Sequence, residues 1–206
     1  MNAHQTATTD TPLRIAVIIG SIRQDRFGPT PARWIADQAA KRDGLDVDVV
    51  DLIDYECPVV LGGNDYDAKP PASVQELSQR LKPADAFIVV TPVYNRSYPA
   101  SLKSAIDWLY PEWQLKPVGL MSYGGITGGL QAIDHLRDVF TEFNAVALRD
   151  TITFPNFWEK FDHDGRPTDP ELTTKLATSF LDQLTWWGHT LRQGRHERPY
   201  PDGIEM

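Results

Sequence analysis

The sequence predicts an α/β fold: a five-stranded parallel sheet of strand order 2-1-3-4-5, with helices on both faces. Strand and helix patterns alternate along the 206 residues, as expected for β-α units joined by right-handed crossovers. The run over 13–20 is almost wholly apolar, which is typical of a strand buried on both faces. The run DVDVVDL over 46–52 alternates in polarity, which indicates an edge strand. Five strands, with the second at an edge, favour this order over the six-stranded dinucleotide-binding order.

The first β-α unit joins the strand at 13–20 to a helix expected over 31–41. Thr30 is the expected N-cap, because its hydroxyl can accept from a free backbone N–H of the first turn. Pro31 suits the first helical position, and Gly44, shortly after the expected helix, is the residue that terminates it. The apolar residues between them recur at helical spacing, so this helix is expected to pack against the sheet.

The remaining elements follow from the same two periodicities. We expect further strands over 86–90, 118–122 and 146–154, the last a mixed strand at the other edge. We expect further helices over 72–82, 99–110, 129–143 and 171–192. In the last helix the expected inward stripe is Leu172, Leu176, Phe180, Leu184 and Trp187. The whole pattern is that of a flavodoxin-like fold.

Composition and charge bound the domain organisation. With 41% hydrophobic and 23% charged residues, the chain has the composition of one globular domain. We expect this domain over 13–193, between a disordered leader at 1–12 and a polar C-terminal tail at 194–206. The leader lacks the basic start and apolar centre of a signal peptide, and no apolar run reaches the ~20 residues of a membrane span. We therefore expect no membrane partner.

The charge and the cysteine count narrow the partners and the compartment. A net charge of −8 argues against nucleic acid as a partner, because DNA-binding domains carry a basic surface. The single cysteine, Cys57, excludes an internal disulfide and fits a cytoplasmic location. Nothing near it in the sequence would lower its pKa, so we interpret it as an unreactive thiol.

Three unusual loops follow the predicted first, third and fourth strands. They read GSIRQDRFGPT at 20–30, TPVYNRSYP at 91–99 and SYGGITGG at 122–129. The carboxyl ends of parallel strands meet at one edge of a sheet, and ligands of open α/β sheets bind there, near the point where the strand order reverses. We therefore expect the three loops to form one binding site.

The first loop has the features of an anion site. It leads from a strand into a helix N-terminus, where free N–H groups and the helix dipole favour an anion. Ser21 adds a hydroxyl, and Arg23 and Arg26 add guanidinium groups suited to phosphate oxygens. The sequence contains neither GxxxxGK[ST] nor a GxGxxG after the first strand, so a mononucleotide fits better than a triphosphate or a dinucleotide. The alternative is a helix-capping loop with solvated arginines.

The other two loops suit a flat heterocycle. In the second loop, Tyr94 can either stack on a ring or line its edge, while Asn95, Ser97 and the backbone N–H groups from 93 to 97 are donors. Four glycines in the third loop let the backbone approach a ring closely. Taken singly, the second loop is alternatively a structural turn, and the third a flexible connection.

These stretches resemble the NADPH-dependent FMN reductase family, which has a flavodoxin-like fold and includes flavin, quinone, chromate and azo-dye reductases. The matching stretches are GSIRQDRF at 20–27, TPVYNRSYPASLKSAIDWL at 91–109 and SYGGITGGLQAIDHLR at 122–137. The resemblance implies FMN as cofactor and NADPH or NADH as co-substrate. It also implies hydride transfer from the nicotinamide to bound FMN and then to a small acceptor, with no catalytic side chain and no metal ion.

The resemblance also implies the cofactor contacts. Ser21 and Arg23 would contact the FMN phosphate, residues 92–97 would surround the isoalloxazine, and residues 122–125 would lie along its other side. The expected cofactor-binding residues are Ser21, Arg23, Arg26, Phe27, Gly28, Pro92, Val93, Tyr94, Asn95, Arg96, Ser97, Ser122, Tyr123, Gly124 and Gly125.

Three positions depart from the family pattern. The common loop GSxRxxSFN has serine where this chain has Arg26, and asparagine where it has Gly28. We interpret Arg26 as a guanidinium that replaces one phosphate-binding hydroxyl. Arg96 stands where many members carry a small residue, and it either contacts the nicotinamide nucleotide's phosphates or narrows the pocket.

Two other functions stay open from the sequence: a non-catalytic flavodoxin-like electron carrier, and a nucleotide-binding regulator that binds no flavin. Carriers usually have acidic rims around the flavin, whereas Arg23, Arg26 and Arg96 suit an anionic nicotinamide donor. The small-molecule acceptor is not determined. We also expect a homodimer or homotetramer, with the apolar stripe of the helix at 99–110, together with Trp108 and Trp113, as its contact surface.

Other candidate sites have weaker patterns. The five histidines lack the spacing of metal ligands, and His135, in a predicted helix, is interpreted as a surface or capping residue. Asp162, Asp164 and Gly165 resemble a calcium loop only in the order D-x-D-G, which is common in turns. We therefore predict no metal site.

Overall fold

The strand order of the sheet confirms the prediction. The computed structural model describes residues 11–62, 69–198 and 200. The strands are β1 (Leu13–Ile19), β2 (Leu45–Asp51), β3 (Ala86–Pro92), β4 (Pro117–Gly124), β5 (Val146–Ala147) and β6 (Ile152–Pro155). Their order is β2-β1-β3-β4-β5, with β6 also paired to β4, and every pairing is parallel. The alternating segment β2 lies at an edge, as predicted.

The prediction of one continuous strand over 146–154 is wrong. β5 pairs with the start of β4, and β6 pairs with its end. Val118 pairs with Ala147 and Met121 with Ile152, so the outer chain takes five steps where β4 takes three. These extra residues interrupt the ladder as a bulge does, and they divide the edge into two short strands.

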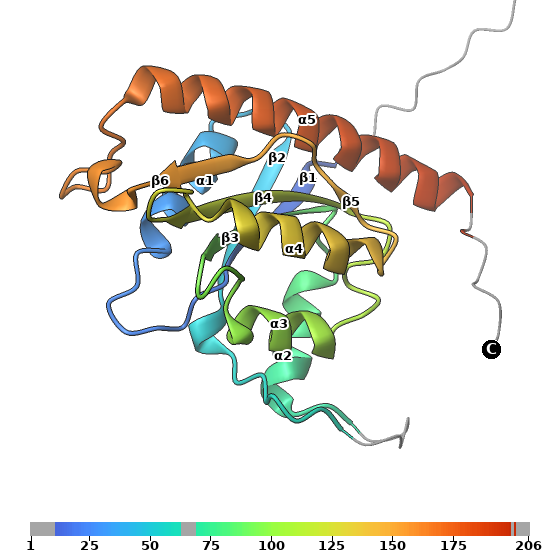
Figure 1. Ribbon diagram of the computed structural model, residues 1–206. Helices are drawn as coiled ribbons and strands as arrows, with labels where there is room; N and C mark the ends of the chain where they lie inside the picture. Colours follow the sequence, from blue (N-terminus) through green and yellow to red (C-terminus); the bar gives the residue numbers. More distant parts are fainter. Residues whose placement is uncertain (1–10, 63–68, 199, 201–206) are drawn as a thin grey trace, which may run out of the picture.

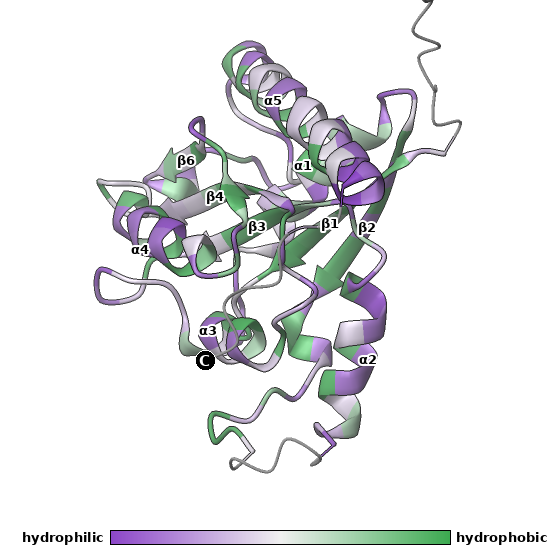
Figure 2. Ribbon diagram, turned by 90° about the vertical axis from the view of Figure 1, so that its right-hand side faces the viewer, coloured by the Kyte–Doolittle hydropathy of each residue, from purple (hydrophilic) through white to green (hydrophobic). Residues whose placement is uncertain are grey.

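Helices cover both faces of the sheet. They are α1 (Pro29–Ala40), α2 (Ala72–Leu81), α3 (Ala100–Trp108), α4 (Leu130–Thr141) and α5 (Pro170–Glu197), with the short 3-10 helices η1 (Leu52–Asp54) and η2 (Phe157–Glu159). α1 and α5 lie on one face, and α2, α3 and α4 on the other (Figure 1). The strands between these two layers are strongly hydrophobic (Figure 2). All residues of β3 and β4 are buried, as strands covered on both faces require.

The boundaries of all five helices differ from the prediction, and the differences at α1 and α5 change the role of a predicted residue or segment. α1 begins at Pro29 with Gly28 as its N-cap, so Thr30 lies inside the first turn and does not cap it. α5 continues to Glu197, which places residues 194–197 of the expected tail in the helix. Most of the expected leader and the end of the expected tail lie outside the described residues, and the domain limits of 13–193 stay a prediction.

The buried stripe of α5 also differs from the predicted one. Phe180 and Leu184 are buried, but Leu172 and Leu176 are 52% and 39% exposed. A strict spacing of four residues turns about 40° per step away from a fixed face, because the helix period is about 3.6 residues. The buried residues of α5 are therefore Thr173, Ala177, Phe180, Leu181, Leu184 and Gly188.

The surface predicted for dimer contacts on α3 belongs to the core instead. Leu102, Ala105 and Ile106 are buried against the sheet, and Trp113 is only 1% exposed. Trp108 is half-buried, and its Nε1 donates to the carbonyl oxygen of Pro58 at 2.7 Å. A helix that packs on a sheet and a helix that packs on a second subunit show the same apolar spacing, so the pattern alone did not separate them.

Asp85 and Arg192 attach the C-terminal half of α5 to the rest of the domain. Oδ2 of Asp85 accepts from Arg192 Nη1 at 3.2 Å, and its Oδ1 accepts from Arg195 Nη2 at 3.5 Å. Arg192 also donates to the carbonyl oxygens of Pro12 and Thr11, at 3.1 and 3.2 Å. The two described residues of the expected leader therefore lie against α5.

Two glycines of α5 have opposite surroundings, which gives a matched test of the packing. A Cβ at Gly188 would lie 2.6 Å from Leu13 Cδ2, whereas a Cβ at Gly194 would meet no atom within 4 Å. We expect Gly188→Ala to lower the free energy of unfolding by about 1–3 kcal/mol through overpacking. Gly194→Ala should raise it by about 0.5–1 kcal/mol through helix propensity. Urea denaturation measures both, and equal effects would contradict the packing of α5 on β1.

Candidate functional site

The three predicted loops line a common cavity at the carboxyl edge of the sheet. Its volume is about 470 Å³, within the usual range for ligand pockets. The lining residues are Arg23, Gln24, Asp25, Arg26, Phe27, Pro92, Val93, Tyr94, Tyr123, Gly124, Gly125 and Phe157. The expected cofactor residues that do not line it are Ser21, Gly28, Asn95, Arg96, Ser97 and Ser122.

Three of these absent residues lie buried behind the cavity wall. The hydroxyl of Ser21 lies 2.8 Å from that of Tyr94, and Ser122 Oγ donates to the carbonyl oxygen of Gly128 at 2.7 Å. Gly28 is covered by Tyr123, because a Cβ at Gly28 would lie 3.0 Å from the Tyr123 hydroxyl. Their observed role is to hold the wall in place, and their contact with a cofactor stays a prediction.

The first loop brings two arginines to the cavity, and they differ in burial and in ion pairing. Arg23 is exposed, and its guanidinium has no partner in the described part of the chain. Arg26 is mostly buried and forms an ion pair with Asp51 at the end of β2. Its Nε is buried without a hydrogen-bond partner among the described residues. Both arginines retain donors for an anion in the cavity.

The second loop closes in a tight turn. Tyr94 N donates to Ser97 O at 2.7 Å, and Ser97 N donates to Tyr94 O at 3.0 Å. The central residues Asn95 and Arg96 have φ angles of 49° and 69°, in the left-handed region that such turns require and that glycine usually occupies. Arg96 is exposed at this tip and outside the cavity lining. Ser97 Oγ lies 3.0 Å from Nδ1 of the exposed His135, which joins the turn to α4.

This turn leaves fewer backbone donors than the sequence suggested. The N–H groups of Tyr94 and Ser97 bond across the turn, and Val93 N donates to Tyr123 O at 3.2 Å. The N–H groups of Asn95 and Arg96 have no partner in the described ranges. Only these two of the five expected donors are available to a ligand.

The hydroxyl groups of Ser21, Tyr94 and Tyr123 cluster together and join the first loop to the second loop and to β4. Burial, together with the neighbouring Tyr94, raises the pKa of the Tyr123 phenol. The backbone of Gly28, the charge of Arg26 and the hydroxyl of Ser21 offset this only in part. Tyr123 is therefore a neutral phenol at neutral pH. Tyr123 therefore contributes an uncharged polar group to the cavity lining, while Ser21 bonds to Tyr94 from behind the wall.

One wall of the cavity is aromatic. The ring centroid of Phe27 lies 5.4 Å from that of Tyr123 and 4.7 Å from that of Phe157. Phe157 lies in η2, directly after β6, and was not predicted. The available signal was its position after a strand, because every strand of a parallel sheet ends at this edge.

The third loop brings backbone close to the second. A Cβ at Gly124 would lie 2.6 Å from Val93 Cγ1, so only glycine fits there without displacing Val93. Gly128 and Gly129 have φ angles of 61° and 88°, which allow the chain to turn sharply into α4. The glycines of this loop therefore serve close approach to the second loop and the turn into α4, while their close approach to a flat ring stays a prediction.

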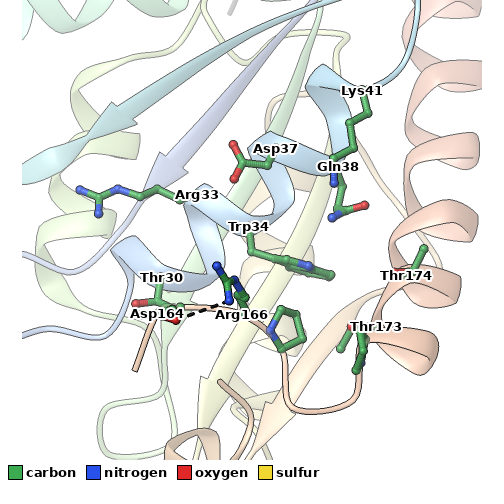
Figure 3. A pocket seen from close by; sticks show the side chains of 13 residues that line it. Thr30, Arg33, Trp34, Asp37, Gln38, Lys41, Asp164, Arg166, Thr173 and Thr174 are labelled. Atoms are coloured by element: carbon green, nitrogen blue, oxygen red, sulfur yellow. Dashed lines mark ion pairs between the residues drawn. The ribbon is translucent and has the colours of Figure 1, made fainter. Parts of the chain in front are cut away.

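A larger cavity, of about 560 Å³, lies elsewhere, beside α1 (Figure 3). It is bounded by α1, the turn that carries Asp164 and Arg166, and the start of α5, with Trp34 inside it (Figure 3). Arg166 pairs with Asp164 at 3.5 Å. None of the expected cofactor residues lines this cavity. We assign the candidate site to the smaller cavity, because open α/β sheets bind ligands beyond the carboxyl ends of their strands.

The residues considered for metal or nucleophile chemistry have structural surroundings. Asp162 Oδ1 accepts from the backbone N of Asp164 at 3.0 Å and of Arg166 at 2.8 Å, so this carboxylate is used within its own turn. In the described ranges, no group of three or more His, Cys, Asp or Glu side chains is arranged to hold a metal ion.

No helix in these ranges combines the length and apolar character needed to cross a bilayer.

Residues 13–159 match the protein family described as NADPH-dependent FMN reductase. The chain belongs to this family. An NAD(P)H-dependent FMN reductase of Schizosaccharomyces pombe is 38% identical over 124 residues, which is 56% of this chain and 60% of that protein. The chain therefore spans somewhat less than two thirds of this relative's length. The 2-hydroxy-1,4-benzoquinone reductase of a Burkholderia species is 31% identical, over 85% of this chain and 96% of that protein.

A solved structure agrees with the family assignment. FerB, a flavoenzyme NAD(P)H:acceptor oxidoreductase from Paracoccus denitrificans, superposes with a TM-score of 0.70 at 28% identity. The match covers 86% of this FMN reductase family member and 98% of FerB. The flavodoxin-like fold expected from the sequence is thereby confirmed.

The cavity of this FMN reductase family member has the chemistry to fit FMN. Among the described residues, the Arg23 guanidinium and the buried Nε of Arg26 both lack an acceptor, which a phosphate monoester would supply. The aromatic wall at Phe27 and Phe157 and the close backbone at Gly124 suit a flat, largely apolar ring. Phosphate-binding and ring-binding features thus occur in one cavity.

Cys57 provides a test of the unreactive-thiol interpretation. The residue is half-buried, and this burial raises the pKa of its thiol. Near neutral pH the thiolate fraction should be smaller than in an unperturbed cysteine. We expect iodoacetamide to alkylate Cys57 at least about threefold more slowly in the folded protein than in urea, with the two rates converging as the pH rises. Faster alkylation of the folded protein would contradict this.

Proposed function

We propose that the protein is an FMN-dependent NAD(P)H oxidoreductase that uses the cavity at the carboxyl edge of the sheet. The observation that carries the proposal is the meeting, in one family member, of unsatisfied arginine donors and an aromatic wall in a single cavity. When bound, FMN would supply the redox chemistry, accepting two electrons from a nicotinamide and passing them to an acceptor. The protein itself binds and orients the cofactor, and the reaction needs no side-chain nucleophile.

The lining residues divide into two ends. Arg23 and Arg26 would hold the phosphate end, where their charges oppose that of the anion. Phe27, Tyr123 and Phe157 would exclude water from one side of the ring. This division orients an elongated ligand, because its anionic end and its flat end each have one favourable place.

The rim does not favour a non-catalytic electron carrier. Arg23 and Arg26 line the cavity, and Arg96 is exposed at the neighbouring turn. A cationic rim attracts an anionic nicotinamide donor more readily than it docks a basic protein partner. NADPH and NADH both carry the required charge, so both are candidate donors.

We further infer a quinone-type small molecule as the acceptor, because the Burkholderia relative is named for such a substrate. We infer a cytoplasmic protein from its lone free thiol.

We also infer a homodimer or homotetramer, with a contact surface other than the buried face of α3. Exposed apolar side chains such as Ile22 of the first loop and Val59 support this inference, and light scattering would measure the mass.

The direct experiment is reconstitution with FMN followed by an activity screen. We expect the protein to bind FMN with a flavin absorption spectrum and to oxidise NADPH or NADH when a benzoquinone is supplied. Apoprotein without added FMN is the control. Flavin binding without steady-state nicotinamide oxidation would indicate a carrier, and no flavin binding would contradict the proposed function.

Arg23→Ala tests the phosphate end. Loss of one charge-assisted contact should weaken FMN binding by about 1.5–3 kcal/mol, or roughly 10- to 150-fold. Riboflavin, which lacks the phosphate, should bind equally well to the variant and the wild type. Arg33→Ala, which removes an arginine from the other cavity, is the matched control. Unchanged FMN affinity in Arg23→Ala would exclude this loop as the phosphate site.

A further inference from the structure

Arg26 is held by a carboxylate at the end of the neighbouring strand. Its Nη2 donates to Asp51 Oδ2, and the two side chains are only 14% and 20% exposed. The register of the sheet explains why they meet. Ile19, the last residue of β1, pairs with Asp51, the last residue of β2. The loop that follows β1 therefore starts level with this carboxylate.

Asp51 has little freedom of its own. Its Oδ1 accepts from the backbone N of Ile53 at 3.2 Å, which is the N-cap bond of η1. One carboxylate oxygen thus caps a helix while the other binds a guanidinium. This fixes Arg26 relative to the sheet, so an otherwise flexible side chain is already ordered before a ligand binds.

The remaining edge of the Arg26 guanidinium is unsatisfied. Arg26 lines the cavity, and its Nε is buried without a hydrogen-bond partner among the described residues. A buried donor without an acceptor is unfavourable, more so when it is charged. Arg26 lines the cavity, so an anionic oxygen that enters it and reaches Nε would supply the acceptor at a guanidinium already held in place.

Asp51 also brings a negative charge near the expected anion, and this opposes binding. Asp51 is not among the lining residues of the cavity, and its carboxylate pairs with Arg26, which is one of them. Its charge is compensated at short range by the guanidinium, so its longer-range repulsion of an anion is weak and screened. Orientation of Arg26 is therefore the larger of the two effects.

We propose that Asp51 is a positioning residue that aims the free edge of Arg26 at the phosphate of FMN. The inference rests on the proposed function, because it requires FMN in this cavity. It makes the phosphate-dependent part of cofactor binding rely on a residue that does not touch the cofactor. Arg23, which has no such anchor among residues 11–62, 69–198 and 200, supplies charge without a fixed direction.

Asp51→Asn tests the proposal, because asparagine retains an oxygen that can cap Ile53 but loses the charge that holds Arg26. Dissociation constants for FMN and riboflavin are measured by flavin fluorescence in one buffer. We expect FMN binding to weaken about tenfold and riboflavin binding to stay within about twofold. Asp48→Asn is the control, since Asp48 lies on the same strand but pairs with Arg80 at 2.7 Å. It should leave both constants unchanged.

Each other outcome has a distinct meaning. Unchanged or tighter FMN binding in Asp51→Asn, or an equal loss for FMN and riboflavin, would overturn the positioning role. Wild-type protein that binds neither flavin would instead defeat the proposed function before any variant is compared. If Asp51→Asn does not fold, Arg26→Lys decides the matter, because lysine keeps the charge but lacks the Nε edge. It should show the same selective loss of FMN binding, and wild-type FMN affinity in this variant would overturn the proposal.

Discussion

Burial of the central strands on both faces is the constraint on which the site depends. β1, β3 and β4 lie between two layers of helices. A polar side chain buried between these layers without a hydrogen-bond partner would be unfavourable. In a parallel sheet, every strand enters its following loop at the same edge. The polar loops after these three strands are therefore forced together, and the cavity forms where they meet.

The edge strand β2 contributes to the site although none of the described residues in the loop after it lines the cavity. Its register with β1 places Asp51 beside the first loop, where the carboxylate meets Arg26. In a chain of net charge −8, the cavity thus has one arginine that is anchored and one whose guanidinium has no partner in the part of the chain that the structure describes. An anionic ligand gains charge complementarity from both and a prepared geometry from one.

Left-handed backbone in the second loop also depends on its neighbours. Asn95 and Arg96 both have positive φ angles, which cost free energy in residues that carry a Cβ. The two backbone bonds between Tyr94 and Ser97, and the contact of Ser97 with His135, hold this conformation. Together with the bond from Val93 N to Tyr123 O, the two backbone bonds occupy three of the five N–H groups from 93 to 97 and leave the two at the tip without a partner among the described residues.

The sequence by itself determined the kinds of element, the edge position of β2 and the three loops that form the site, because hydrophobic period and turn residues are local properties. Only the tertiary structure decided which side chains face the cavity. Ser21 and Ser122 bond to groups behind its wall, while Phe157 reaches it from β6. The sequence likewise did not show that Arg26 pairs with Asp51, or that the apolar stripe of α3 packs against the sheet. Such partners are brought together by packing, and apolar spacing is the same whether a helix covers a sheet or another subunit.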